Sequence, residues 1–175
     1  MSALQRVTTE FIEMEDRMRI SGENEQGEVT SFWLTQRLLI RLVAHLVASL
    51  EKGAPKGGKL QGHDERISEM VQGMAQQAAQ AALNSEEIPV KDPDYEHTWL
   101  ALEVDIKHID EQLHLEFRNK SGVSAEVTLE VSHLRQWLSI LYRLWIQAEW
   151  PKAIWPQWMT DSIAETANQP SAPLH

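Results

Sequence analysis

The fold is decided by residues 100–131, LALEVDIKHIDEQLHLEFRNKSGVSAEVTLEV, because apolar and polar side chains alternate through three runs of this stretch. A two-residue period places the apolar side chains of a strand on one face of a sheet. Asp110–Glu111 and Asn119–Gly122 separate the runs and are typical of turns. The stretch therefore predicts a three-stranded antiparallel meander with one buried face and one exposed face.

Residues 9–22 show the same two-residue period near the N-terminus. The apolar side chains occupy even positions: Ile12, Met14, Met18 and Ile20. This pattern predicts one further half-buried strand, with Asp16 at a bulge or at a sheet edge. Together with the meander it gives an antiparallel sheet of about four strands.

Three segments carry the three-to-four-residue period of amphipathic helices. The first has Thr30 or Ser31 as its N-cap and ends at Gly53, the second covers residues 64–84, and the third follows Ser132 and ends before Pro151. Two or three helices covering one sheet predict an α+β fold. The second helix has a shallow apolar face, which predicts loose packing or contact with a partner. That face consists of Ile67, Met70, Val71, Met74, Ala78 and Ala82.

The chain of 175 residues is long enough for one such domain, which we assign to residues 1–160. Residues 53–62 contain four glycines and a proline, which predict a flexible loop. Residues 161–175 are polar and contain prolines, which predict a disordered tail.

Charge and hydropathy argue against nucleic acids and membranes as partners. The net charge of −10 repels phosphate backbones, so we expect no nucleic-acid partner. Arginine or histidine interrupts the longest apolar stretches, and none approaches the roughly 20 apolar residues of a membrane span. The N-terminus reaches Arg6 before the apolar core of a signal peptide can form. We therefore expect no membrane partner and a cytoplasmic location.

The sequence contains no pattern that points to catalysis or to a cofactor. It has no cysteine, which excludes thiol catalysis and cysteine-ligated metals, and its seven histidines lack metal-ligand spacing. Residues 53–59 fit the start of a phosphate-binding loop, but Leu60 stands where that loop needs a hydroxyl side chain for magnesium. We predict a protein that is not an enzyme and that has no cofactor and no metal site.

Tryptophan is unusually frequent, with seven in the chain. Trp150, Trp155 and Trp158 lie around two prolines in a segment without helical or strand period, so they dock on their own domain or anchor a partner. With Trp33 they are the candidate contact residues, and residues 64–84 are a second candidate surface. We therefore predict a non-enzymatic protein–protein interaction or assembly protein, as a homo-oligomer or bound to a protein partner.

A polar strip on the first helix supports an alternative function. Arg37, Arg41 and His45 recur every four residues and could supply the polar groups of an otherwise apolar pocket. A cavity beside this strip would favour a binding module for an apolar or aromatic small molecule, whereas a filled core would argue against it.

Two segments resemble a family of small uncharacterised bacterial proteins. In the first, Asp16-Arg-Met-Arg-Ile20 leads into Ser31-Phe-Trp-Leu-Thr-Gln-Arg-Leu-Leu39, a strand followed by a helix that opens with Trp-Leu-Thr and an Arg-Leu pair. The second combines Leu134-Arg-Gln-Trp-Leu138 with Ala148-Glu-Trp-Pro151. The resemblance implies a bacterial cytosolic origin and no particular activity, since none is assigned to that family.

Overall fold

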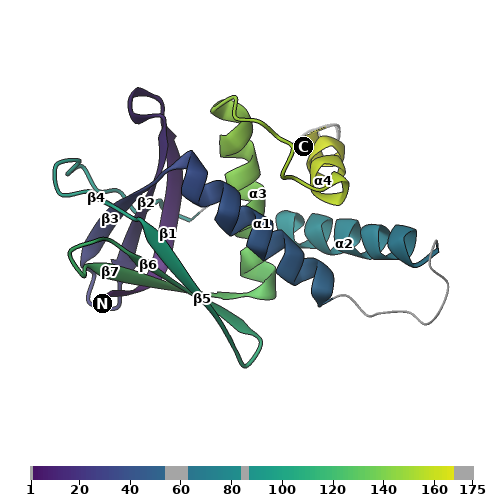
Figure 1. Cartoon of the computed structure of the whole chain (residues 1–175), viewed down its shortest axis with the longest axis horizontal. Helices are drawn as coiled ribbons and strands as arrows, with labels where there is room; N and C mark the ends of the chain where they lie inside the picture. The colour runs from purple at the N-terminus through teal and green to yellow at the C-terminus, as the bar shows by residue number, and fades with distance from the viewer. Residues whose placement is uncertain (1, 54–62, 84–86, 168–175) are drawn as a thin grey trace, which may run out of the picture.

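A computed structural model describes residues 2–53, 63–83 and 87–167, which form a curled sheet with helices on one side (Figure 1). The strands are β1 (Ser2–Ile12), β2 (Arg17–Asn24), β3 (Val29–Leu34), β4 (Trp99–Leu100), β5 (Glu103–Ile109), β6 (Gln112–Arg118) and β7 (Ser124–Glu130). The helices are the short 3-10 helix η1 (Glu13–Glu15), α1 (Gln36–Lys52), α2 (His63–Ala81), α3 (Val131–Gln147) and α4 (Gln157–Ala167). This arrangement is of the α+β class, as predicted.

The sheet has the strand order β4-β3-β2-β1-β7-β6-β5. β1 runs parallel to β7 and β3 parallel to β4, whereas all other neighbours are antiparallel. The prediction of an antiparallel sheet of about four strands with two or three helices is therefore wrong. The described residues form a mixed sheet of seven strands with four α-helices. Within this sheet β5, β6 and β7 form the predicted antiparallel meander.

The N-terminal segment accounts for part of this error. Residues 9–22, predicted as one strand, fold into a hairpin of β1 and β2. The turn uses η1 and Asp16, whose φ of 47° is left-handed. Aspartate tolerates this conformation better than most residues, so no glycine or proline marks the turn. Met14, predicted on the buried face, lies in the turn and is 94% exposed.

A further strand occupies the predicted start of the first helix. Thr30 and Ser31 belong to β3, and α1 begins only after Thr35, whose Oγ1 accepts a hydrogen bond from the Leu38 amide at 3.2 Å. Phe32 and Trp33 are buried on opposite faces of β3. The sheet is covered on both sides at this point, and this is why the segment lacks the period of a half-buried strand.

The two edges of the sheet are joined by a very short piece of chain. β4 and β5 lie at opposite ends of the strand order, yet only Ala101 and Leu102 separate them. The Ala101 amide donates to the Trp33 carbonyl at 3.0 Å, and the Leu102 amide donates to the Arg118 carbonyl at 2.8 Å. The sheet must therefore curl until β3 and β6 approach each other.

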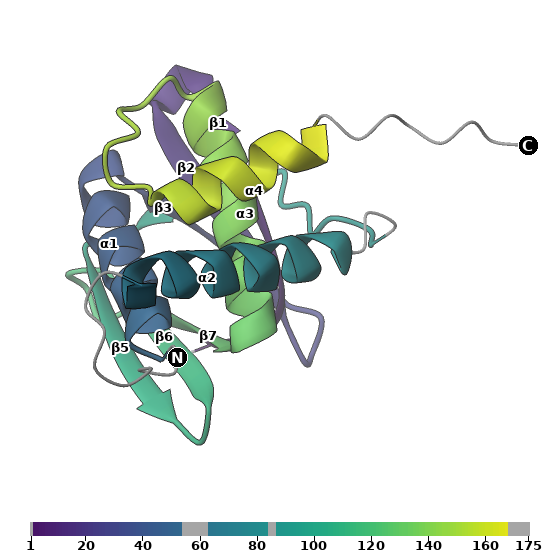
Figure 2. The same cartoon turned by 90° about the vertical axis from the view of Figure 1, so that its right-hand side faces the viewer.

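The helices form two layers on one side of the sheet (Figures 1 and 2). α1 and α3 lie next to the strands, and α2 and α4 lie beyond them. The spacing of apolar residues in the third helix predicts a buried face of Leu134, Trp137, Leu138, Leu141, Leu144, Trp145 and Ala148. All of them are buried except Leu144 and Ala148, which are half-buried. No helix within the described parts of the chain is both long and apolar enough to cross a membrane.

The C-terminal boundary predicted for the domain also needs correction. Residues 161–167, predicted to belong to a disordered tail, are part of α4, whose Ser162 is 2% exposed. Residues 168–175 lie outside the described residues, as do residues 54–62 of the predicted flexible loop.

Candidate interaction surface

α2 turns its apolar face away from the rest of the protein. Ile67, Met70, Val71 and Met74 follow the spacing of a helix face, and their exposed fractions are 57%, 62%, 42% and 64%. Ala78 continues this face and is also exposed. We call these five residues the α2 stripe. The sequence predicted these five residues, together with Ala82, as one helix face, and the structure places the five in contact with solvent. Ala82 lies just after the end of α2.

The opposite face of α2 is polar and buried. Gln72, Gln76 and Gln80 recur every four residues, with exposed fractions of 2%, 0% and 6%. Gln72 Nε2 donates to the Leu50 carbonyl of α1 at 2.8 Å, and Gln76 Nε2 donates to Ser139 Oγ of α3 at 2.7 Å. α2 is thus attached to α1 and α3 through side-chain amides, where most amphipathic helices use aliphatic side chains.

Arg135 of α3 completes this buried contact. Its guanidinium donates to Gln72 Oε1 at 2.5 Å and lies 5.7 Å from the ring of Trp158, an arrangement that allows a cation–π interaction. Burial lowers the pKa of Arg135. The Gln76 amide also donates to the Arg135 carbonyl at 2.8 Å. The same group of side chains therefore links α2, α3 and α4.

Two features of α2 have no explanation within the described part of the chain. Both polar atoms of the Gln80 amide are buried without a hydrogen-bond partner there, an arrangement that costs free energy. Gly73 lies in the middle of the helix, where glycine destabilises by about 1 kcal/mol relative to alanine. A Cβ at this position would meet no atom within 4 Å, so internal packing does not require glycine.

The candidate contact tryptophans are core residues. Trp33, Trp150, Trp155 and Trp158 are between 5% and 7% exposed, so they cannot serve as anchors for a partner while the chain is folded in this way. Trp145 of α3 makes edge-to-face contacts with Trp150 and Trp155, at centroid distances of 5.0 and 5.6 Å. These contacts dock the proline-containing segment onto α3, the intramolecular alternative that the sequence left open.

The predicted polar strip lies on the outward face of α1. Arg37, Arg41 and His45 are all exposed. Two surface depressions, of about 610 and 410 Å³, lie elsewhere, and neither is lined by the strip. The first is lined by residues of β1, β2, β3 and segment 87–91, and the second by residues 110–112 and 130–132. This arrangement does not favour the small-molecule alternative.

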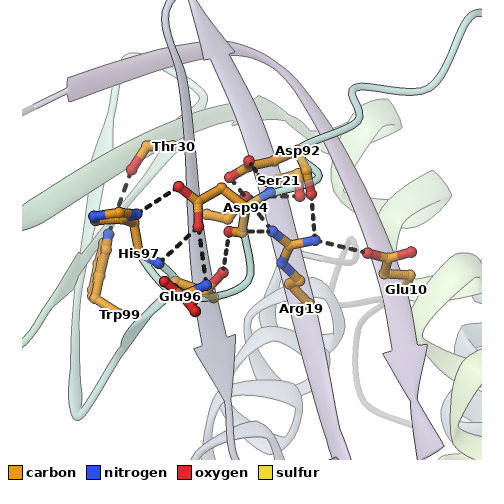
Figure 3. A network of polar contacts seen from close by, with 11 residues as sticks. Glu10, Arg19, Ser21, Thr30, Asp92, Asp94, Glu96, His97 and Trp99 are labelled. Carbon is orange, nitrogen blue, oxygen red and sulfur yellow. Dashed lines mark hydrogen bonds and ion pairs between the residues drawn. The ribbon is translucent and has the colours of Figure 1, made fainter.

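A separate polar network lies on the sheet face opposite the helices, around Arg19 (Figure 3). Arg19 is 1% exposed, and its guanidinium donates to the carbonyls of Asp92 and Asp94 at 2.8 and 3.1 Å. Its Cζ atom lies 4.1 Å from the ring centroid of Tyr95. A hydrogen bond with His97 lowers the pKa of Asp94. These contacts fasten the connector before β4 to β2, which is a structural role.

No group of three or more potential metal ligands occurs in residues 2–53, 63–83 and 87–167. No protein-family model, curated protein or solved structure matches the chain. The resemblance to the bacterial family therefore stays a prediction.

Proposed function

We propose that this chain is a non-enzymatic protein–protein interaction or assembly protein, with the α2 stripe as its contact surface. The observation that carries the proposal is the inverted orientation of α2, with large apolar side chains outside and glutamines inside. Each Å² of apolar surface removed from water contributes about 25 cal/mol, so covering the stripe with another apolar surface would be favourable.

The surroundings of the α2 stripe fit a contact surface. Glu65, Arg66 and Glu69 are exposed in the N-terminal half of α2. Arg66 lies one turn before Met70, whereas the two glutamates lie on the helix face of Gln72 and Gln76. Two of the central side chains are methionines, whose flexible thioethers adapt to the shape of a partner. The net charge of −10 argues against nucleic acid as that partner. The proposal includes the cytoplasmic location expected from the sequence.

A co-purification experiment with paired variants tests this function. We expect the proteins other than the chain itself that co-purify with the tagged chain from its own host to be lost in Met74→Glu. They should be retained in Ile146→Glu, which places the same charge at a 42% exposed isoleucine of α3. Retention of all partners by both variants, with unchanged folding by circular dichroism, would contradict the proposal.

A further inference from the structure

We infer that β5 is a second contact surface, at which the β5 strand of another copy of this chain extends the sheet. The two strands would pair in antiparallel orientation around a two-fold axis at Ile106, perpendicular to the sheet. This inference goes beyond the proposed function, because it concerns an edge of the sheet and does not involve the α2 stripe. Three properties of β5 support it: a long backbone edge, apolar side chains that are only half covered, and a self-complementary order of charges.

β5 presents a long and regular edge of the sheet. It is the last strand in the strand order, and among the described strands it pairs only with β6. All seven residues of β5 pair with β6 in one register without a bulge, and the strand contains no proline and no glycine. The other edge strand, β4, has only two residues. Short strands, bulges and prolines hinder the pairing of an edge with another chain, and β5 has none of these three features.

The apolar side chains of β5 are only half covered. Val104 and Ile106 lie opposite Phe117 and Leu115 of β6 and therefore share the buried face of the sheet with them. Phe117 and Leu115 are fully buried, whereas Val104 and Ile106 are half-buried. A strand added at the edge would cover these two side chains further. The acidic and lysine side chains of β5 all lie on the opposite, outer face: Glu103, Asp105 and Lys107.

The charges of β5 favour one register of self-pairing. Facing residues of two neighbouring strands point to the same side of a sheet, so the buried faces of both copies coincide when the axis passes through one residue of each strand. An axis at Ile106 overlaps all seven residues and places Asp105 of each copy opposite Lys107 of the other. An axis at Asp105 or at Lys107 would instead place two like charges opposite each other. Facing opposite charges stabilise a strand pair, and like charges destabilise it.

The same register matches charges on the neighbouring strands. On the outer face, three carboxylates lie opposite one another in a row across β5, β6 and β7: Asp105, Glu116 and Glu126. The adjacent row across the same strands consists of Lys107, His114 and Thr128. With the axis at Ile106, the carboxylate row of each copy continues into the lysine row of the other. The pairing therefore places a row of negative charge next to a cationic side chain.

Lys107 lacks an acidic partner within its own copy. Arg118 Nη1 lies 2.6 Å from Asp105 Oδ2, and His114 Nδ1 lies 2.8 Å from Glu126 Oε1, so both ends of the carboxylate row have a partner. Lys107 forms no ion pair with the residues that the structure describes. A second copy would supply the missing carboxylate, since Asp105 lies on the same outer face and two residues away along the strand.

The shape and size of the surface indicate a modest dimer. The β5–β6 hairpin extends beyond the helices at one end of the molecule (Figures 1 and 2). A strand of seven residues has a length of about 24 Å, so the contact is smaller than a standard interface. We expect a dimer that dissociates on dilution. Because the described sheet has only one long edge strand without these protecting features, pairing around a two-fold axis stops at two copies.

Disulfide formation between single-cysteine variants tests the register, because the natural chain contains no cysteine. Asp105→Cys and Lys107→Cys are purified separately, mixed in equal amounts and oxidised mildly. We expect a cross-linked dimer in the mixture, since the two positions face each other. Either variant alone should stay monomeric, because equal positions lie diagonally, too far apart for a disulfide. Asp105→Cys mixed with Lys120→Cys, at an exposed position of the β6–β7 turn, is the control and should not cross-link.

Charge reversal with rescue tests the pairing without cross-linking. Lys107→Glu replaces two attractive pairs by two repulsive ones, and we expect the dissociation constant in sedimentation to rise about tenfold or more. Asp105→Lys should weaken the dimer in the same way. A mixture of these two variants restores opposite charges at both pairs and should dimerise like the natural chain. Lys120→Glu carries the same charge change outside β5 and should leave the dimer unchanged, with folding checked by circular dichroism.

Several results would overturn the pairing through β5. These are a natural chain that stays monomeric at high concentration, a dimer of Lys107→Glu as tight as that of the natural chain, and no rescue in the mixture. Cross-linking of either cysteine variant with itself would overturn the register. Met74→Glu should retain the dimer, and its loss there would assign self-association to the α2 stripe. The proposed function is tested separately, by the proteins other than the chain itself that Met74→Glu loses.

Discussion

α2 and α3 are both amphipathic helices, but they present opposite faces to the protein. α3 buries Leu138 and Trp145 completely and turns Ile146 towards solvent. α2 buries Gln76 completely and turns Met70 and Met74 towards solvent. Periodicity therefore locates a helix and its apolar face, whereas the direction of that face depends on the partners available to it. α3 finds its apolar partners within the chain, and we propose that α2 finds them in a protein partner.

The two helices should differ most in the stability that is lost when one side chain of the apolar face is truncated. Trp145→Ala removes a fully buried side chain that contacts two other tryptophans, so we expect a loss of about 3–5 kcal/mol in the free energy of unfolding. Met74→Ala should change it by less than about 0.5 kcal/mol in dilute protein. Urea denaturation measures both, and equal losses would mean that α2 buries its apolar face in solution.

Removal of a buried glutamine tests how α2 is attached. Gln76→Ala deletes an amide that donates to the Arg135 carbonyl and to Ser139 Oγ, so we expect a loss of about 1–3 kcal/mol. Hydrogen exchange should accelerate in α2 more than in α3. Gln26→Ala, at an exposed turn position, is the control and should leave both measurements unchanged. Unchanged stability of Gln76→Ala would mean that the glutamine face does not hold α2.

Gly73→Ala should separate folding from association. The open space around Gly73 accepts a methyl group, so we expect the monomer to gain about 0.5–1 kcal/mol of stability from the better helix propensity of alanine. Gly73 lies about 120° around the helix from the centre of the α2 stripe, so the same methyl group should leave co-purification through the stripe unchanged. A loss of stability would show that the space around Gly73 is filled in solution.

The smallest expected effect is a difference in oxidation rate among the methionines. Dilute hydrogen peroxide should oxidise the exposed Met70 and Met74 before the fully buried Met18 and Met159, as peptide mass spectrometry would record. Binding of the proposed partner to the α2 stripe should slow oxidation of Met70 and Met74 but not of Met14. Met14 lies in the β1–β2 turn and provides the internal control. Equal slowing at all three positions would argue against the α2 contact.

The sequence predicted the strands and helices whose hydrophobic period matches the faces that are buried in the structure. β6 alternates strictly because the helix layer covers only one of its faces, and Leu113, Leu115 and Phe117 are buried as expected. The hairpin of β1 and β2 was missed because its turn uses Asp16 in a left-handed conformation, without glycine or proline. β3 was missed because its buried residues face both sides of the sheet.

The candidate surface was predicted only in part. Periodicity identified the α2 stripe. The lack of a helical or strand period around Trp150, Trp155 and Trp158 left these tryptophans as possible contacts, since aromatic residues serve docking within a chain and between chains equally well. Gln72, Gln76 and Gln80 form the one signal in the sequence that could have settled the orientation of α2. Three glutamines at four-residue spacing provide amide groups that can bond to helix ends and to the serine hydroxyl of α3, as two of them do here.

The short link between the two edges of the sheet has a consequence for synthesis on the ribosome. The hairpin and β3 leave the ribosome before the later strands of this chain, and β3 gains its outer neighbour only with Trp99 and Leu100. β1 gains its second neighbour only with Ala125–Val127. For most of translation the N-terminal strands therefore present two unpaired backbone edges, which favour aggregation.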